Sequence, residues 1–383
     1  MEKNLAFIAV ITMCFSTAAT SKIAPLYRAR PGTSIPNQYI VVLKDEFGGD
    51  LDHVLEEVEN SNQLRKLDAR VTHVYSNVYR GFSLHIPETA LLWIRKLSQI
   101  AYVEEDCIIT AQRVPWNLDR IDQRDLPLNS VYMPAGDGEG VNVYVVDTGI
   151  RYSHEEYSGR ASFFYDYETD GDGSDCNGHG THGAGVVGGT DFGVAIMTSL
   201  YSVRVLSCFG AGSTSQIIAG IDYIAAWGVR PGVASISIGG GPSTSLDNAV
   251  RGLVAAGFSA CVSAGGAATN ACNFSPARVE EAITVGSMDS NDYISSSSNT
   301  GPCIDMFAPG VDIQSAWHTS DTATAVLSGT SSSTAHVAGA CAIILEENPT
   351  WSPKQVVTEL IENCTKGRLQ NVPDGTYNRI VYT

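Results

Sequence analysis

Apolar runs and polar breaks alternate along residues 39–109 in the order strand, helix, strand, helix, strand. The predicted elements cover residues 39–43, 51–67, 71–84, 88–97 and 101–109. The helical stretches are amphipathic, with an apolar stripe that needs a sheet to cover it. We therefore expect a small α+β unit in this part of the chain, with its own core.

A different pattern begins at residue 141. Short apolar runs such as 141–146 and 233–238 alternate with helical stretches such as 215–227 and 246–256, and Gly-rich loops follow the strand ends. This alternation predicts an α/β fold with a mainly parallel sheet and helices on both faces. Active sites of such sheets are built at the strand ends, where the glycines lie.

The segment between the two patterns, residues 111–116, has no hydrophobic periodicity and contains a proline. Such a segment is exposed and cleavable, so we place a processing site near Gln112 or Arg113. The N-terminus has one lysine, an apolar run over residues 5–15 and small residues at 16–20, which is the pattern of a secretory signal peptide. A buried N-terminal helix is the alternative.

The domains that follow are a signal peptide at 1–20, a second segment at 21–112 with its folded part at about 39–110, and a main domain at 113–383. We expect a protein that is secreted and extracellular, and monomeric. The net charge is −17 and the 24 Lys and Arg residues are dispersed, which argues against nucleic acid and anionic membranes as partners. Every apolar run is shorter than the roughly 20 residues that span a bilayer.

Nine cysteines in an exported chain, with no C-x-x-C pair, favour disulfides over a metal site. Cys14 lies in the signal segment and Cys107 in the segment after it.

Three polar residues lie at the edges of predicted elements. Asp147 ends an apolar strand, His179 lies where a helix begins, and Ser331 precedes an apolar helix. A serine hydroxyl becomes a nucleophile when an imidazole takes its proton and an acid orients that imidazole. Each residue alone is commonly structural, as a turn residue, a packed histidine or an N-cap. Together they follow the order Asp, His, Ser of the subtilisin constellation.

The surrounding motifs, from about Trp116 to the C-terminus, resemble the subtilisin-like serine proteases, and most closely their proteinase K-like branch. They read V-D-T-G-I at 146–150, N-G-H-G-T-H-G-A-G at 177–185, L-Y-S-V-R-V-L at 200–206, S-I-G-G-G at 237–241, I-D-M-F-A-P-G at 304–310 and S-G-T-S at 328–331, leading into H-V-A-G at 336–339. The resemblance implies a secreted serine endopeptidase that forms an acyl-enzyme on Ser331. Its base would be His179 rather than His182.

Residues 39–109 resemble the inhibitor-type propeptide of these proteases, which assists folding, is cut by the enzyme itself and blocks the cleft. The resemblance also assigns substrate-binding positions, with broad specificity as the expectation. Ser237, Ile238 and Gly239 would pair with the substrate backbone, and Ala264, Gly265 and Gly266 would form the wall of the pocket before the cut.

At residue 266 this chain has glycine, whereas the family has an asparagine whose side-chain amide donates to the developing oxyanion. The helix after Ser331 differs too: the family usually reads Met, Ala, Thr, Pro, His, and this chain reads Ser, Ser, Thr, Ala, His at 332–336. A slow self-processed zymogen is our interpretation. The alternative is a pseudoprotease that acts as a secreted binding protein.

By the same resemblance, Cys176 pairs with Cys208 and Cys272 with Cys303, which leaves the odd set Cys261, Cys341 and Cys364. Structural calcium is implied at Asp305 with carbonyls near Glu280 and Ala282, and a second site at Asp119, Asp122 and Gln123, for which a solvated acidic loop is the alternative. Residues 170–175 lack the Gly and Glu of an EF-hand loop and are predicted to form a turn. We expect no organic cofactor. The expected partners are protein or peptide substrates and the chain's own propeptide.

Overall fold

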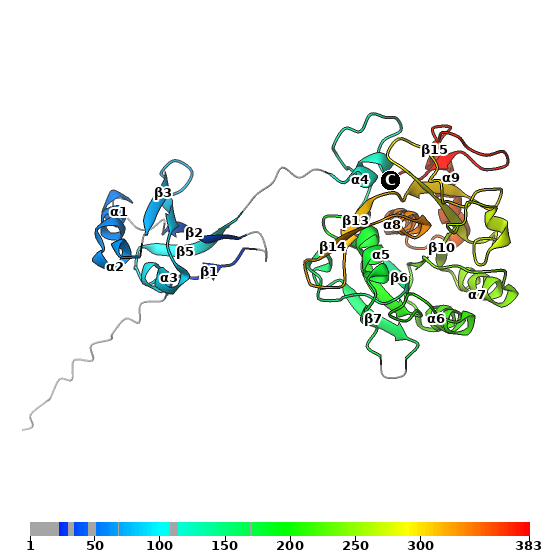
Figure 1. Ribbon diagram of the computed structural model, residues 1–383, viewed down its shortest axis with the longest axis horizontal. Helices are drawn as coiled ribbons and strands as arrows, with labels where there is room; N and C mark the ends of the chain where they lie inside the picture. Colours follow the sequence, from blue (N-terminus) through cyan, green and yellow to red (C-terminus); the bar gives the residue numbers. More distant parts are fainter. Residues whose placement is uncertain (1–22, 30–33, 45–50, 68, 108–113, 169–170) are drawn as a thin grey trace, which may run out of the picture. The chain divides into compact units, whose positions relative to one another are not determined.

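A computed structural model describes residues 23–29, 34–44, 51–67, 69–107, 114–168 and 171–383. The chain divides into two compact units, Met1–Ala111 and Gln112–Thr383 (Figure 1). The predicted signal segment 1–20 and the predicted processing site at Gln112 or Arg113 lie outside the described residues.

The smaller unit is a sheet whose strands follow the order β1-β5-β2-β4-β3 and whose inner face is covered by helices. Its elements are β1 (Leu26–Tyr27), β2 (Ser34–Leu43), α1 (Leu51–Asn60), α2 (Asn62–Arg65), β3 (Arg70–Tyr75), β4 (Gly81–His85), α3 (Glu88–Arg95) and β5 (Ile100–Cys107). One core joins Phe82 and Leu84 of the sheet to Val54 of α1 and Ile94 of α3. Helices and strands therefore bury their apolar faces against each other.

The segment predicted as one strand over residues 71–84 differs from the sequence expectation. Residues 71–84 form two antiparallel strands, β3 and β4, and not one. The polar residues Ser76 and Asn77 turn the chain, because they favour turns over extended backbone. The two short strands then pair within the same sheet.

The larger unit is built on a sheet with the strand order β15-β16-β12-β11-β10-β9-β6-β8-β7. These strands are β6 (Asn142–Asp147), β7 (Ala161–Asp166), β8 (Ser199–Arg204), β9 (Gly232–Ile236), β10 (Ser259–Ser263), β11 (Ile283–Met288), β12 (Met306–Pro309), β15 (Thr365–Lys366) and β16 (Arg379–Ile380). All neighbours are parallel except β15 and β16. A separate hairpin joins β13 (Ile313–Ala316) to β14 (Thr324–Leu327).

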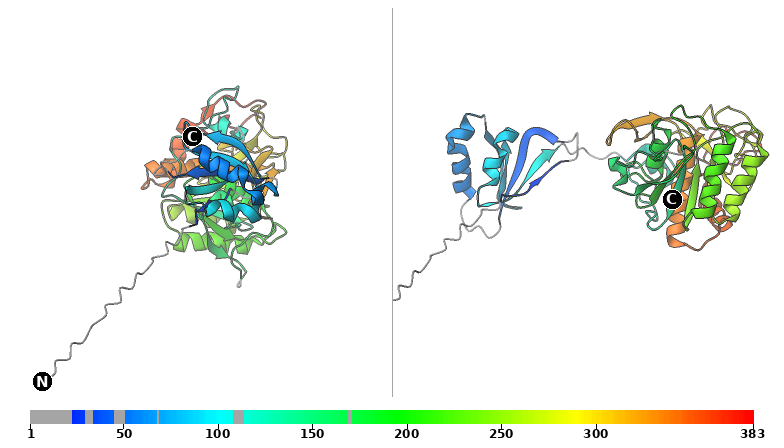
Figure 2. Two further views of the ribbon diagram at one scale, coloured as in Figure 1. Left: turned by 90° about the vertical axis from the view of Figure 1, so that its left-hand side faces the viewer. Right: turned by 90° about the horizontal axis from the view of Figure 1, so that it is seen from below.

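Helices cover both faces of this sheet. They are α4 (Trp116–Ile121), α5 (His179–Gly188), α6 (Thr214–Trp227), α7 (Thr244–Ala255), α8 (Thr330–Glu347) and α9 (Pro353–Asn363). Side chains of β6 alternate between the two cores: Val143 and Val145 pack with α5 and α8, whereas Tyr144 and Val146 pack with α6 and α7. Figure 2 shows α6 and α7 side by side. The predicted α/β fold is confirmed.

The carboxyl ends of β6, β9 and β10 lie next to one another. Val146 of β6 is in register with Ile236 of β9, and Ile236 with Val262 of β10. The residues that follow these positions therefore emerge at one edge of the sheet. Within the described residues, every helix is too short or too polar to cross a bilayer.

Candidate active site

Asp147 and His179 meet where β6 ends and α5 begins. The His179 Nδ1–H donates to the Asp147 carboxylate, with both oxygens 2.8 Å from Nδ1. Asp147 is buried, whereas about a third of the His179 side chain is exposed. The residue after His179 must be glycine, because a Cβ on Gly180 would lie 2.2 Å from the carbonyl oxygen of Gly149. This close approach of α5 to the strand end brings acid and imidazole together.

Asp175 fixes the start of α5, a role that the sequence analysis missed. Its Oδ1 accepts from the backbone N–H groups of Asn177 and Gly178, and its Oδ2 accepts from the N–H and hydroxyl of Thr181. The Thr148 hydroxyl also donates to Asp175, and accepts from Gly180 N–H. The signal was present, since an acid beside a helix start satisfies its unpaired N–H groups.

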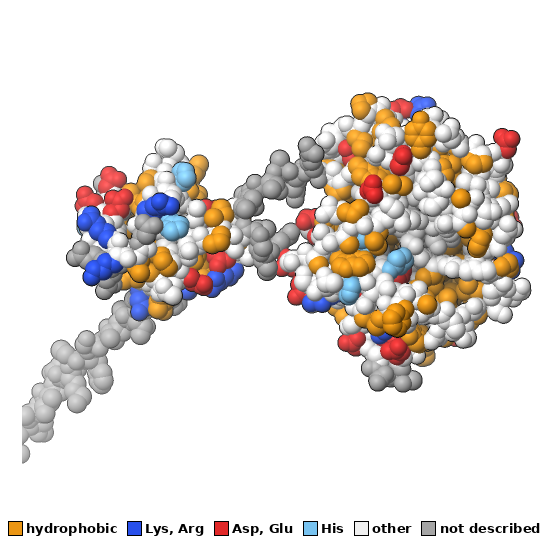
Figure 3. Space-filling model, in the orientation of Figure 1, with side chains coloured by type: hydrophobic (Ala, Val, Ile, Leu, Met, Phe, Trp, Pro, Cys, Tyr) orange, Lys and Arg blue, Asp and Glu red, His pale blue; other side chains and the backbone are white. Residues whose placement is uncertain are grey.

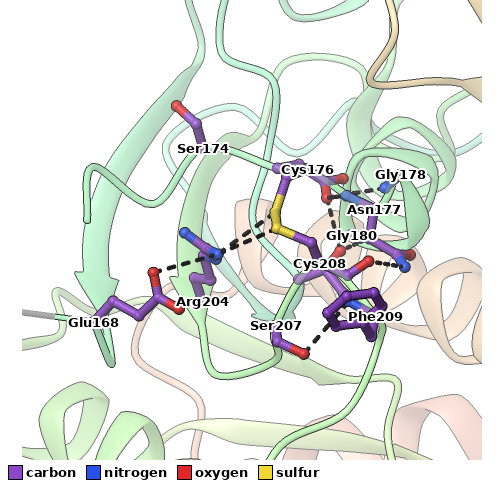
Figure 4. Close-up of a disulfide and its surroundings, with 12 residues drawn as sticks. Glu168, Ser174, Cys176, Asn177, Gly178, Gly180, Arg204, Ser207, Cys208 and Phe209 are labelled. Carbon is purple, nitrogen blue, oxygen red and sulfur yellow. Dashed lines mark hydrogen bonds and ion pairs between the residues drawn. A yellow bond between two sulfur atoms is a disulfide. The ribbon is translucent and has the colours of Figure 1, made fainter.

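A disulfide between Cys176 and Cys208 ties the loop before His179 to the loop after β8 (Figure 4). The Asn177 side-chain amide donates to the Cys208 carbonyl at 2.9 Å, and the Arg204 guanidinium lies against both sulfurs. A second disulfide joins Cys272 to Cys303. Both are the pairs that the resemblance implies. Cys261 and Cys341 are buried free thiols with their sulfurs 3.7 Å apart, and Cys364 is also a buried free thiol.

Ser331 is the second residue of α8 and shares a cavity of about 170 Å³ with His179, His182 and Ser237. Its hydroxyl donates to the Ser237 carbonyl at 3.0 Å, and the Ser237 hydroxyl donates to the Ser331 carbonyl at 3.2 Å. Hydrogen bonds of a catalytic serine often tighten only when substrate binds. In this structure the Ser331 hydroxyl is directed to the Ser237 carbonyl, and Ser331 and His179 line the same cavity.

The pKa values of the two histidines of the motif are shifted in opposite directions. The charge of Asp147 raises the pKa of His179 to about 9, against the effect of burial. Burial lowers the pKa of His182 to about 4, and its Nε2–H donates to the Ile313 carbonyl at 2.9 Å. His179 is thus the ring beside the acid, and His182 is a neutral ring that binds the β13 backbone. Figure 3 shows histidine side chains reaching the surface of the larger unit.

The segment after β10 carries Ala264, Gly265 and Gly266. Gly265 has φ +95°, and a Cβ there would lie 2.6 Å from the Asn299 amide nitrogen, so this position requires glycine. Asn299 shapes the segment, since its Nδ2 donates to the Ala264 carbonyl. Gly266 differs, because it is exposed and a Cβ there would meet only the Ser297 carbonyl, at 3.9 Å. A larger side chain therefore fits at residue 266.

Helix α8 begins beside this segment. Its N-cap residue, Gly329, has no side chain to cap the first turn, and Gly265 N–H donates to the Thr330 hydroxyl at 3.2 Å. The first N–H groups of a helix have no partner within the helix and carry partial positive charge. The N–H of Ser331 is among them, so a negative charge that develops beside Ser331 is stabilised there.

The acidic residues proposed for calcium have different surroundings. Asp305 accepts from Thr284 N–H through Oδ2, and burial raises its pKa to about 6, so a cation near its other oxygen would relieve the cost of its charge. Both oxygens of Asp119 accept backbone N–H groups, from Asn129 and Ser130. Asp122 accepts from Met133 N–H and has one buried oxygen without a partner. Asp305 fits a calcium ligand, whereas Asp119 serves its own loop.

Among the described residues, no three His, Cys, Asp or Glu side chains are placed to hold one metal ion. The further ligands that the resemblance implies at Asp305 are carbonyl oxygens near Glu280 and Ala282.

Comparisons with known proteins agree on one family. The family model described as "Subtilase family" matches residues 138–379. An extracellular serine proteinase of Thermus sp. (strain Rt41A) is 43% identical over 397 residues, covering 98% of this chain and 96% of that protein. Proteinase R of Parengyodontium album is 36% identical over 375 residues, covering 94% and 92%. A crystal structure of a cold adapted subtilisin-like serine proteinase matches with a TM-score of 0.69 and 47% identity, covering 70% of this chain and 98% of that one.

Proposed function

The chain belongs to the subtilase family of serine endopeptidases, and on this basis we propose that Asp147, His179 and Ser331 are its catalytic triad. One observation carries the proposal: the Asp147 carboxylate lies 2.8 Å from His179 Nδ1, and the His179 ring lines the same cavity as Ser331. With Nδ1 protonated, neutral His179 presents Nε2 as the base.

In the proposed reaction the Ser331 oxygen attacks the scissile carbonyl carbon of a peptide bond while its proton passes to His179 Nε2. The tetrahedral intermediate collapses as the protonated ring gives that proton to the leaving amine, which leaves an acyl-enzyme on Ser331. Water then attacks the acyl carbon while His179 takes its proton. The second tetrahedral intermediate collapses, the proton returns to the Ser331 oxygen, and the acid product is released. Throughout, the Asp147 charge stabilises the imidazolium, in keeping with the raised pKa of His179.

The oxyanion would bind to the uncapped N–H groups at the start of α8, among them that of Ser331. Gly266 supplies no side-chain donor to this oxyanion. Loss of one such donor lowers kcat by about 10²–10³, a magnitude that comes from a subtilisin. The proposal is therefore a working endopeptidase with reduced turnover. The alternative of a non-catalytic binding protein has no support from the relatives, whose names are those of proteases.

The substrate would lie as an extended strand along Ser237, Ile238 and Gly239, with the side chain before the cut against Ala264 and Gly265. Main-chain pairing of this kind makes few demands on sequence, which supports broad specificity. The smaller unit is proposed as an inhibitory propeptide, since it is a separate compact unit that precedes residue 112. Export is proposed from the N-terminal pattern and from relatives named extracellular.

Self-processing tests the triad directly. Wild-type protein and S331A are expressed in parallel, and the intact mass and N-terminus of each product are measured. We expect wild type to lose the segment up to about residue 112 and S331A to keep it.

A serine-directed fluorophosphonate then reports on the hydroxyl itself, because it reacts only with an activated serine. Both proteins must first show the same circular dichroism. If folded wild type is neither cut nor labelled, the proposed activity is wrong and the binding-protein alternative gains support.

A further inference from the structure

The carbonyl groups of the first three residues of α8 each accept a hydrogen bond from a side chain. The Thr334 hydroxyl donates to the Thr330 carbonyl at 2.8 Å, the Ser237 hydroxyl to the Ser331 carbonyl, and His336 Nδ1–H to the Ser332 carbonyl at 2.8 Å. These bonds surround the residue that the proposed function makes the nucleophile. They fix the peptide groups on either side of Ser331.

The His336 ring is itself held by another helix. The Asn117 side-chain nitrogen lies 2.8 Å from His336 Nε2, across 219 positions of sequence. Asn117 is 1% exposed and His336 fully buried. Asn117 lies in the first turn of α4, which follows the predicted processing site by only a few residues.

Chemistry fixes the direction of each bond in this chain. A carbonyl oxygen only accepts, so His336 Nδ1 carries the proton that binds Ser332. In the neutral ring Nε2 is then an acceptor, and the Asn117 amide donates to it. Burial lowers the pKa of His336 to about 4, with His182 as the titratable group facing it, so the ring stays neutral. The amide and this single tautomer are compatible with each other.

We propose that Asn117 is a positioning residue for Ser331: its amide selects the Nδ1–H tautomer of His336, which holds the Ser332 carbonyl and so the first turn of the catalytic helix. The inference rests on the proposed role of Ser331. By this inference, the residues at the start of the processed enzyme, which include Asn117, help to hold Ser331 in place. Trimming beyond residue 116 would remove that support.

Kinetics of N117A are the first test. The alanine leaves His336 Nε2 without a donor, and we expect kcat to fall about fivefold to tenfold, the worth of about one hydrogen bond, with KM changed less than twofold. The matched control is L118A, because Leu118 is the next residue of α4 and packs in the main core, and its side chain has no hydrogen-bonding group that could bind the His336 ring. If L118A at equal folded fraction lowers kcat equally, loosening of α4 explains the effect and the proposal fails.

A pH profile separates positioning from packing. In N117D the carboxyl and the ring can keep the bond only while they share one proton. We expect kcat of N117D to lie between those of N117A and wild type at neutral pH, and to fall at alkaline pH as that proton is lost. A profile parallel to that of wild type contradicts the proposal.

The ring state can be read without turnover. In ¹⁵N-histidine-labelled S331A, two-bond ¹⁵N–¹H spectra should show His336 protonated at Nδ1 and unprotonated at Nε2. In S331A/N117A the His336 ring should no longer be found only as this tautomer. A ring protonated at Nε2 in S331A overturns the inference, even if the wild-type enzyme proves inactive. The converse outcome is that S331A shows the expected ring state while wild-type protein neither reacts with the fluorophosphonate nor cuts itself. That result would refute the proposed function and leave the tautomer inference standing.

Discussion

The Asp147 carboxylate and the His179 imidazole are joined by a bond of 2.8 Å at the end of a buried strand, while the outer part of the ring is open to the cavity. Asp147 is buried, and its carboxylate accepts hydrogen bonds from this ring and from the backbone N–H of Thr148. The ring is therefore coupled to a charge that water screens poorly. In the proposed reaction, this relationship determines the pH at which His179 can act as a base.

The first prediction concerns that pH. In the proposed reaction His179 must be neutral to accept the Ser331 proton, and its pKa is raised to about 9, so kcat/KM should rise with pH toward that value. D147N removes the main cause, and the pKa of His179 should fall toward about 6.5. NMR titration of His179 in S331A and S331A/D147N measures the shift. D374N, which removes an exposed charge elsewhere, is the control; an equal shift in D374N would contradict the pairing.

Gly266 is the subject of the second prediction. Space at this position admits a side chain, so G266N should place an amide donor beside the oxyanion and raise kcat by about 10²-fold, the magnitude known from a subtilisin. The control is G266L, which has a similar size and no donor. Both are assayed with one peptide substrate. A gain in G266L, or none in G266N, would show that residue 266 does not limit the rate.

The sequence predicted the parts of this site that depend on local pattern. The apolar run ending at Asp147 is β6, and His179 begins α5, because periodicity and flanking glycines are local properties. The β3–β4 hairpin was missed because one apolar stretch cannot reveal where it turns. The Asn117–His336 bond was missed for another reason: its partners are 219 positions apart, and only packing of α4 against α8 brings them together.

The third prediction tests calcium at Asp305. A cation beside this carboxylate would stabilise the folded protein in proportion to its affinity, by about 2.7 kcal/mol at a concentration 100 times its Kd. Chelation should then lower Tm in S331A, and calcium should restore it. In S331A/D305N both effects should vanish. A Tm that responds equally in both proteins would place the ion elsewhere, and no response in either would remove calcium from the site.

The last prediction concerns stability in acid. His182 and His336 are buried and neutral, and the pKa of each is lowered to about 4 in the folded protein. Unfolded histidine has a pKa near 6.5, so between about 6.5 and 4 the unfolded chain binds more protons and stability falls as pH falls. Each ring contributes up to about 3 kcal/mol to this loss by pH 4.

Urea unfolding of S331A at several pH values measures this slope. H182N should reduce the dependence on pH below about 6.5, because asparagine cannot take up the proton. H53N, at an exposed histidine of the smaller unit, is the control for the loss of a histidine elsewhere in the chain. If H182N unfolds with the same pH dependence as its parent, protonation of the buried His182 ring does not cause the loss of stability in acid, and this prediction is wrong.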